Sequence, residues 1–374
     1  MNNGWKKQPF EDCIEQVTYT QKIQRKDFLD DGAYPVVSQE EAFINGYWDN
    51  EADLFKVTTP IVVFGDHTKV LKYVDFDFVL GADGVKILQP REFLLPKFFF
   101  YQLQSANLDS LGYARHYRLL RELEITYPTR PEQQRIVGIL DEAFDGISTA
   151  KANAEKNVQN TCALFESHLQ SVFTQRGPGW VDRTLDQVCI VERGSSPRPI
   201  KNYFTTKPDG VNWIKIGDTE EGGKYVYSTA QKITPESAKQ SRFVKEGDFI
   251  LTNSMSFGRP YIMKTSGYIH DGWFVLRLNI SIDRDYFYYL LSSRFVQSQF
   301  AQLASGSVVK NISGDLVKKA VLPIPPLAHQ HVIVEKLLEI SAETQRLATL
   351  YERKLAALEA LKKSLLHQAF SGEL

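Results

Sequence analysis

Apolar residues recur at alternating intervals of four and three in two segments of the chain. In the segment near the end, these positions are Ile333, Leu337, Ile340, Thr344, Leu347 and Tyr351, followed after one shift of phase by Leu355 and Leu358. The segment near the middle has, at the equivalent places, Ile136, Leu140, Ala143, Ile147, Ala150, Ala154, Val158 and Thr161. Such a pattern is typical of a helix that packs against another helix. One amphipathic helix could instead cover its own domain, but two copies in one register favour mutual packing.

The two helical segments are copies of each other. Shifted by 197 residues, 128–177 lies on 325–374 without a gap. Identical pairs include Pro128/Pro325, Gln133/Gln330, Ile136/Ile333, Val137/Val334, Leu140/Leu337, Glu142/Glu339, Ala163/Ala360, Leu164/Leu361, Ser167/Ser364, Leu169/Leu366 and Phe173/Phe370. Proline stands at the start of both copies, where its missing N–H has no cost. A helix of roughly 40 residues is about 60 Å long.

The segments between the helices repeat more faintly. One opens at Trp5 and the other at Trp180, and each contains a predicted β-hairpin around a polar loop, at 65–69 and at 253–259. An Asp-Gly pair follows at the same distance after both loops. The chain is therefore predicted to be an internal duplication of the α+β class, with two α/β globules and two long helices packed as an antiparallel coiled coil. The predicted boundaries are 1–127, 128–178, 179–322 and 323–374.

Composition indicates a folded, soluble protein, since 43% of the 374 residues are apolar and 24% are charged. The net charge of −1 conceals an asymmetry, because residues 1–127 carry a net −5 and residues 179–322 a net +5. Overall charge therefore does not indicate a nucleic-acid-binding protein, and the acidic first globule argues mildly against one.

No apolar run is long enough to span a bilayer, and the N-terminal residues lack the apolar core of a signal peptide. We therefore expect a cytoplasmic protein that does not contact membranes. The three cysteines, Cys13, Cys162 and Cys189, lie far apart without a CxxC pair. This spacing argues against a disulfide framework or a zinc site. All three are expected to be ordinary buried or half-buried thiols.

Signatures of catalysis are missing from the sequence. It contains no [DN]-P-P-[FY] motif of adenine methyltransferases, no GxGxxG loop and no GxxxxGK[ST] loop. Asp75 and Asp77 resemble a metal-binding pair, but alternation along a strand would place both on an exposed face equally well. His67 could act as a general base, yet the second copy has no histidine at the matching place. Catalysis by this chain alone is not expected, and neither is a cofactor or metal ion.

Binding explains the two polar loops better. Their side chains are donors and acceptors of the kinds that contact base edges: Asp66, His67, Thr68 and Lys69 in one, and Asn253, Ser254, Ser256 and Arg259 in the other. Different residues on one scaffold would let the two globules recognise different DNA sequences. Phosphates could be neutralised by Arg115, Arg118, Arg121, Lys215, Arg242, Lys310, Lys318 and Lys319. A single surface lysine or arginine is more often simply solvated.

The segments 128–140 (PTRPEQQRIVGIL) and 325–337 (PPLAHQHVIVEKL) resemble the conserved regions of the specificity (S) subunit of type I restriction–modification systems. Each begins a long helix that ends near Phe173 or Phe370. The globules are similar to the target recognition domains of this family, notably at 34–39 (YPVVSQ), 64–76 and 253–261. The resemblance covers essentially the whole chain. With it, the candidate DNA contacts are Gln39, Asp66, His67, Thr68, Lys69, Arg115, Lys215, Asn253, Ser254, Ser256, Arg259 and Lys310.

The resemblance implies a defined role. Members of the family bind a split target in double-stranded DNA, one half-site per recognition domain, and dock two methyltransferase (M) subunits on the paired helices. Those partners bind S-adenosylmethionine and methylate adenine N6 after base flipping, and the resemblance leaves open whether restriction subunits, which hydrolyse ATP, join them. The second helix departs from the family's usual start, with His329 and Val332 in place of Glu132 and Arg135. This difference puts equal partner contacts at the two ends in doubt.

The predicted arm of about 60 Å corresponds to somewhat under two turns of B-DNA. Because the first globule is acidic, the M subunits are expected to supply much of the phosphate contact. Two alternatives stay open at this point. One is a coiled-coil adaptor whose globules bind proteins, and the other is a fragment of a self-contained methylating or cleaving enzyme, against which the missing motifs weigh.

Overall fold

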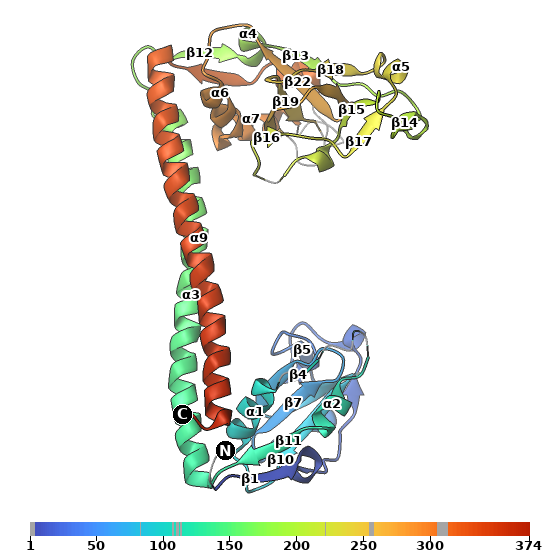
Figure 1. Cartoon of the computed structure of the whole chain (residues 1–374), viewed down its shortest axis with the longest axis vertical. Coiled ribbons are helices and arrows are strands. Elements are labelled where there is room, and N and C mark those ends of the chain that lie inside the picture. The colour runs from blue at the N-terminus through green and yellow to red at the C-terminus, as the bar shows by residue number, and fades with distance from the viewer. Residues whose placement is uncertain are drawn as a thin grey trace. The chain divides into compact units, whose positions relative to one another are not determined.

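The computed structural model describes residues 4–82, 84–106, 108–109, 112, 114–220, 222–253, 258–304 and 313–374. The chain divides into two compact units, one formed by Met1–Lys156 and Tyr351–Leu374 and the other by Asn157–Leu350. Each unit combines a β-rich globule with a segment of both long helices, α3 (Arg130–Thr174) and α9 (Leu327–Ser371) (Figure 1). Within the described ranges, every helix is too short or too polar to cross a membrane.

Unit 1 contains two sheets and a short ladder. One sheet has the order β2 (Ile14–Glu15), β10 (Val85–Pro90), β7 (Ile61–Gly65) and β8 (Leu71–Val74). The other has the order β3 (Lys22–Ile23), β9 (Phe78–Gly81), β4 (Tyr34–Val37) and β5 (Gly46–Trp48), with β6 (Leu54–Phe55) paired to β9. The globule begins and ends in the antiparallel ladder of β1 (Lys6–Pro9) and β11 (Glu124–Tyr127). Its helices are α1 (Pro96–Ser105) and α2 (Tyr117–Arg121).

Unit 2 repeats this plan. One sheet has the order β13 (Cys189–Arg193), β22 (Trp273–Leu278), β19 (Phe249–Thr252), β20 (Pro260–Met263) and β16 (Tyr225–Val226). The other has the order β14 (Phe204–Thr205), β17 (Gln231–Ile233), β15 (Val211–Ile214), β21 (Gly267–Ile269) and β18 (Arg242–Val244). The closing ladder joins β12 (Val181–Thr184) to β23 (Val321–Ile324). The helices are α4 (Leu185–Val188), α5 (Pro235–Ala238), α6 (Arg284–Ser292), α7 (Arg294–Ala304) and α8 (Gly314–Val317).

The predicted long helices are confirmed. In unit 1 their antiparallel direction is fixed by two contacts, from Lys151 Nζ to Glu359 Oε1 at 2.6 Å and from Arg135 Nη2 to the Leu374 carbonyl at 2.8 Å. In unit 2, Leu169 and Phe173 of α3 share a core with Leu337 of α9. All the predicted heptad positions of both helices are buried or half-buried. The α+β class and the antiparallel coiled coil therefore agree with the sequence pattern.

The duplication extends to sheet topology. The predicted hairpins are β7–β8 and β19–β20, both antiparallel. In both units a parallel pair then forms, β4 with β9 and β15 with β21. Since parallel strands need a crossover between them, their recurrence at equivalent places is not a local sequence effect but a repeated fold.

A buried glutamine fixes each long helix to its globule. Gln133 Oε1 accepts the backbone N–H of Leu95, the residue before α1, at 2.7 Å, and Gln330 Oε1 accepts the N–H of Asp283, the residue before α6, at the same distance. Each amide nitrogen donates to the carbonyl of a proline five residues earlier, at 3.0 and 2.8 Å. Both glutamines are at most 1% exposed. The identity of this pair in the repeat therefore has a structural cause: each glutamine holds the first turn of a long helix against a second helix.

Two expectations need correction. Cys162 is exposed, because it follows the seam position Thr161 and so points away from the partner helix, whereas Cys13 and Cys189 are buried. Burial raises the pKa of those two thiols to about 11 and about 12, so they stay protonated. Asp75 and Asp77 are exposed, but they lie in the connection between β8 and β9 and not in a strand. Asp77 Oδ1 accepts the Val57 N–H at 2.7 Å and so shapes that turn.

Candidate nucleic-acid interface

The β7–β8 loop of unit 1 meets the segment after β4. The backbone N–H of His67 donates to Gln39 Oε1 at 3.2 Å, and Thr68 Oγ1 donates to the Gln39 carbonyl at 2.6 Å. Thr68 is exposed, while Gln39 and His67 are half-buried. His67 Nδ1 has no hydrogen-bond partner among the described residues. Three predicted contacts, 28 and 29 residues apart in the chain, therefore form one polar surface.

Glycine at position 84 lets these groups approach. Its φ of +81° is a left-handed conformation that favours glycine, and a Cβ there would collide with the side chains of Gln39 and His67. The Gly84 carbonyl also accepts the Asp66 N–H at 2.7 Å. The Asp-Gly pair seen in the sequence thus supplies a backbone support for the loop, although Asp83 itself lies outside the described residues.

Asp66 lies at the root of the loop and not at its tip. It is 3% exposed, and its Oδ1 accepts the backbone N–H of Tyr117 at 2.7 Å, at the start of α2. Its carbonyl accepts the N–H of His116, also at 2.7 Å. These bonds favour a positioning role for Asp66. They also bring the exposed Arg115 next to the loop, so that this predicted phosphate contact shares the surface.

Lys72 supports the same surface from below. It is 3% exposed, and its Nζ donates to the Ala42 carbonyl at 2.5 Å and to Asn45 Oδ1 at 3.1 Å. These bonds fix the segment that follows Gln39. Burial lowers the pKa of Lys72 to about 8, although the nearby Glu40 acts in the opposite direction.

The stability of the wild-type chain should depend on pH through Lys72. Because its pKa is lower in the folded state than in the unfolded chain, the unfolded chain binds more protons between about pH 8 and 10.5. Raising the pH through this interval should therefore stabilise the folded protein, by on the order of 2–3 kcal/mol. We expect urea unfolding to show this rise for the wild type relative to Lys72→Met, in which the group is absent. Parallel pH profiles of the two proteins would contradict the assignment.

In unit 2, the predicted contact Asn253 is also a loop root. It is 1% exposed, its N–H donates to the Gly272 carbonyl at 2.8 Å, and its Nδ2 donates to the Asp271 carbonyl at 3.3 Å. Its Oδ1 has no partner among the described residues. The loop is thus anchored to an Asp-Gly pair in the same way as the loop of unit 1. Ser254, Ser256 and Lys310, which the sequence also indicates, lie outside the described residues.

The segment from the end of β13 onward was not predicted from the sequence as part of this surface. Ser196 Oγ donates to Asp271 Oδ1 at 3.2 Å and Arg198 Nη2 to Oδ2 at 3.4 Å, while Arg193 Nε donates to the Asp271 carbonyl at 3.1 Å. Gly194 between them lies so close to the His270 carbonyl that a Cβ would collide with it. Both arginines are exposed beside the loop root. The signal was present as two arginines on either side of a Gly-Ser-Ser-Pro segment at the end of a strand.

His270 and Lys215 complete this surface. Burial lowers the pKa of His270, and the charge of Lys215 lowers it further against the opposing charges of Asp271 and Asp218. His270 Nδ1 accepts the Gly272 N–H at 2.9 Å, which is compatible with the neutral ring. Lys215 is half-buried where β15 ends. Its charge acts on His270, which bonds Gly272 at the root of the β19–β20 loop, so Lys215 lies near that root.

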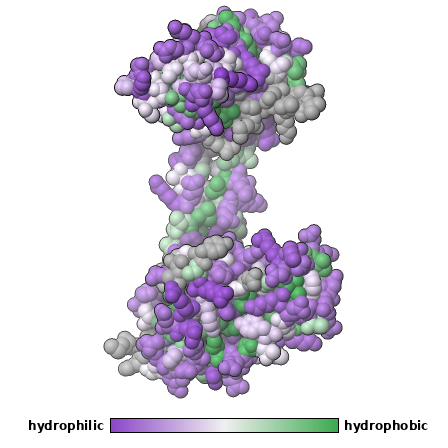
Figure 2. Space-filling model, turned by 90° about the vertical axis from the view of Figure 1, so that its right-hand side faces the viewer, coloured by the Kyte–Doolittle hydropathy of each residue, from purple (hydrophilic) through white to green (hydrophobic). Residues whose placement is uncertain are grey.

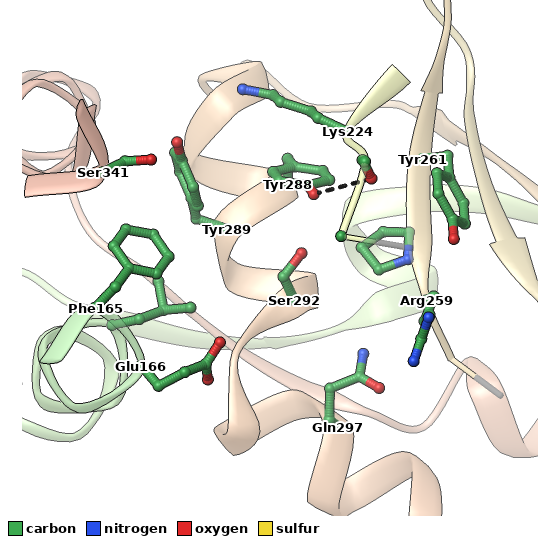
Figure 3. A pocket seen from close by; sticks show the side chains of 14 residues that line it. Phe165, Glu166, Lys224, Arg259, Tyr261, Tyr288, Tyr289, Ser292, Gln297 and Ser341 are labelled. Atoms are coloured by element: carbon green, nitrogen blue, oxygen red, sulfur yellow. Dashed lines mark hydrogen bonds between the residues drawn. The ribbon is translucent and has the colours of Figure 1, made fainter. Parts of the chain in front are cut away.

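Arg259 occupies a different position, in a cleft of about 580 Å³ between the globule of unit 2 and the helix segments of that unit. Figure 3 shows Arg259 and Gln297 on one side and Phe165, Glu166 and Ser341 of the helices on the other. The backbone N–H of Arg259 donates to Thr252 Oγ1 at 2.9 Å, which fixes the end of the loop. The cleft lining also includes Lys224, Tyr261, Tyr288, Tyr289 and Ser292.

In the part of the chain that the structure describes, no three histidine, cysteine, aspartate or glutamate side chains are grouped to bind an ion. What the two units share is a hairpin loop tied at its root to an Asp-Gly turn, with polar and cationic side chains around it. Such groups can donate to base-edge acceptors and to phosphates.

The chain is similar in sequence to known proteins over most of its length. Residues 178–353 match the family described as the type I restriction modification DNA specificity domain. The specificity subunit of the type I restriction enzyme EcoR124I/EcoR124II from Escherichia coli is 24% identical over 337 residues, which are 84% of this chain and 81% of the relative.

Two solved structures share the fold. A chain from a study of complex assembly and conformational transition in a type I R-M system superposes with a TM-score of 0.74 at 17% identity, covering 99% of this chain and 98% of that one. The HsdS subunit from Thermoanaerobacter tengcongensis has a TM-score of 0.59 at 19% identity, covering 99% and 97%. The fold places this chain in the class of proteins that repeat a globule and a long helix. Residues 178–353 match the DNA specificity domain family, and over most of its length the chain is similar to specificity subunits of type I restriction enzymes, the likeness that its sequence predicts.

Proposed function

We propose that this chain is the subunit that selects the DNA target of its restriction–modification complex, with one half-site contacted by each globule. The observation that carries the proposal is the equivalence of the two loops. Both are tied at the root to an Asp-Gly turn, through the N–H of Asp66 and of Asn253, yet the side chains beyond the roots differ. Equal scaffolds with unequal polar groups are suited to contact two different base sequences.

In unit 1 the side chains proposed for base contact are Gln39, His67 and Thr68, and Arg115 is proposed for a phosphate. In unit 2, Arg193 and Arg198 join the predicted Lys215 and Arg259. Arginine and lysine are the residues that most often contact guanine and phosphate. Asp66 and Asn253 are proposed to hold these loops in shape, since both are almost fully buried.

The paired helices are proposed to dock two methyltransferase subunits. Ala163, Leu164 and Ser167 are identical to their repeat partners Ala360, Leu361 and Ser364, and all six are exposed. Exposed residues do not need to be identical for the two helices to pack against each other. Their identity therefore supports the same partner contact at both places. Leu164 is 57% and Leu361 47% exposed, and Figure 2 shows apolar residues in green among polar ones on the paired helices.

Chemistry is assigned to the partners in this proposal. The methyltransferase subunits would bind S-adenosylmethionine and methylate adenine N6, and restriction subunits would cleave DNA, while this chain supplies selection and assembly. The relatives with this architecture are named as specificity subunits of restriction enzymes, which supports the division of labour.

The test is to co-express the chain with the methyltransferase encoded beside it and to map methylated adenines across the host genome. We expect a split, asymmetric motif. Exchange of 65–69 for another loop should alter one half-site, and exchange of 253–259 should alter the other. Methylation that is unchanged without the chain would favour the adaptor, whose globules bind proteins.

A further inference from the structure

Unit 1 has a second surface, and the proposed role of the β7–β8 loop in base contact does not account for its residues. A cleft of about 400 Å³ lies between the globule and α9. The cations in its lining are Lys69, Lys362 and Lys363, and its floor includes Leu71 and Leu103. Lys69 belongs to the β7–β8 loop, so the cleft is continuous with the surface proposed for base contact.

The acidic group in the lining does not cancel these cations. Glu359 is paired with Lys151 through a hydrogen bond of 2.6 Å. That bond lowers the pKa of Glu359 most, and the charges of Lys151, Lys362 and Lys363 lower it further. Three lysines therefore act on this one carboxylate, and Lys69 adds a further cation to the same lining, which leaves a positive local charge in a unit whose globule is acidic overall.

Two of the lysines are held in place. Lys69 Nζ donates to the Leu108 carbonyl at 3.2 Å, and Lys362 Nζ lies 5.1 Å from the centre of the Phe144 ring. Lys69 also adopts a φ of +62°, which is uncommon for any residue other than glycine, asparagine or aspartate. Glycine would fit this backbone without strain, so a lysine here points to a use for its side chain.

The corresponding cleft in unit 2 is built differently. The repeat places Phe165 and Glu166 where unit 1 has Lys362 and Lys363. Lys224, the lysine in that lining, is paired with Asp285 at 2.6 Å and lies about 5 Å from the rings of Tyr288 and Tyr289 (Figure 3). The helix-borne cations are therefore a property of unit 1 and not of the repeat.

We propose that Lys69, Lys362 and Lys363 bind backbone phosphates of the DNA next to the half-site contacted by unit 1, so that α9 contributes directly to DNA binding. This inference rests on the proposed function. Phosphate contacts by lysine add affinity without sequence preference and release counterions. They would compensate for the acidic globule around the base-reading loop.

The test uses the complete complex with its methyltransferase and measures DNA affinity by fluorescence anisotropy over a series of NaCl concentrations. Lys362→Gln/Lys363→Gln should weaken binding to every sequence alike and reduce the slope of log Kd against log[salt] by about 1–2. The matched control is Arg353→Gln/Lys354→Gln. These two residues lie nine positions earlier, on the opposite face of α9 at 3.6 residues per turn, and should leave the slope unchanged.

Lys69→Gly separates charge from loop structure. It keeps a residue that accepts the left-handed backbone, so the Tm should not fall, while the slope should decrease by about 1. Slopes equal to the control, in a complex that still methylates a split target, would overturn this inference and leave the proposed function intact. Loss of complex assembly in Lys362→Gln/Lys363→Gln would instead assign these lysines to the subunit interface. A wild-type complex without target-specific methylation would overturn both proposals.

Discussion

Complexes that carry Gln39→Ala/His67→Ala are expected to lose selectivity at one half-site and to retain it at the other. Both side chains lie on the surface formed by the β7–β8 loop and the segment after β4. Each base contact that is lost should reduce discrimination by about 1–3 kcal/mol, or roughly 5- to 150-fold. The half-site contacted by unit 2 has its own loop, so its selectivity should not change.

Methylation rates on a panel of duplexes measure this effect, with each position of both half-sites substituted in turn. Arg353→Gln/Lys354→Gln is the matched control, since both residues are exposed on the α9 segment of the same unit, on the face opposite Lys362 and Lys363. A uniform loss of rate on all duplexes would indicate a damaged complex, and unchanged selectivity at both half-sites would remove Gln39 and His67 from base recognition.

Substitution of Gln133 by alanine is expected to lower the free energy of unfolding by about 2–4 kcal/mol. The variant loses three hydrogen bonds, to the Leu95 N–H and to the carbonyls of Phe93 and Pro128. A buried backbone group without a partner costs about 1–3 kcal/mol, and the site is closed to water because Gln133 is fully buried. Gln330→Ala should act similarly in unit 2, where the Asp283 N–H and the Pro325 carbonyl lose their partner.

Thermal unfolding measures the expected loss of stability in Gln133→Ala, and amide hydrogen exchange shows where in the chain it occurs. Gln134→Ala is the control, because its side chain is exposed on the same turn of α3, and it should change stability by no more than about 0.5 kcal/mol. In Gln133→Ala the loss of protection should concentrate at the start of α1 and α3. Equal stability of Gln133→Ala and Gln134→Ala would contradict the role of Gln133 in holding the start of α3 against α1.

The loops show the limit of sequence reasoning about sites. Residue type and matched position indicated both hairpins and their polar side chains, but Asp66 and Asn253 are loop roots, which only their burial reveals. Polar residues in a loop look alike in the sequence whether they point to solvent or bond the backbone. The DNA contacts themselves stay a prediction.

The contacts between side chains from distant segments could not be predicted, even where the residues themselves gave a signal. Arg193 and Arg198 reach Asp271 across more than seventy residues of sequence, and Lys69 joins Lys362 across almost three hundred. Arg198, Asp271 and Lys69 lie in loops, and the neighbours of these residues are set by sheet order or by helix packing. The local sequence pattern specifies neither the order of strands in a sheet nor the packing of helices.

The resemblance at 128–140 and 325–337 indicated the family, and the sequence by itself determined the plan of this protein: two copies of a globule and a long helix, the heptad seam and the hairpins. These follow from periodicity and repetition, which are local and survive without coordinates. Only the tertiary structure decided which polar residues are buried in hydrogen bonds within the fold, how Gln133 and Gln330 attach the helices to the globules, and where cations gather beside the β7–β8 loop. Those outcomes depend on burial and on contacts across long sequence separations, and both exist only after the chain has folded.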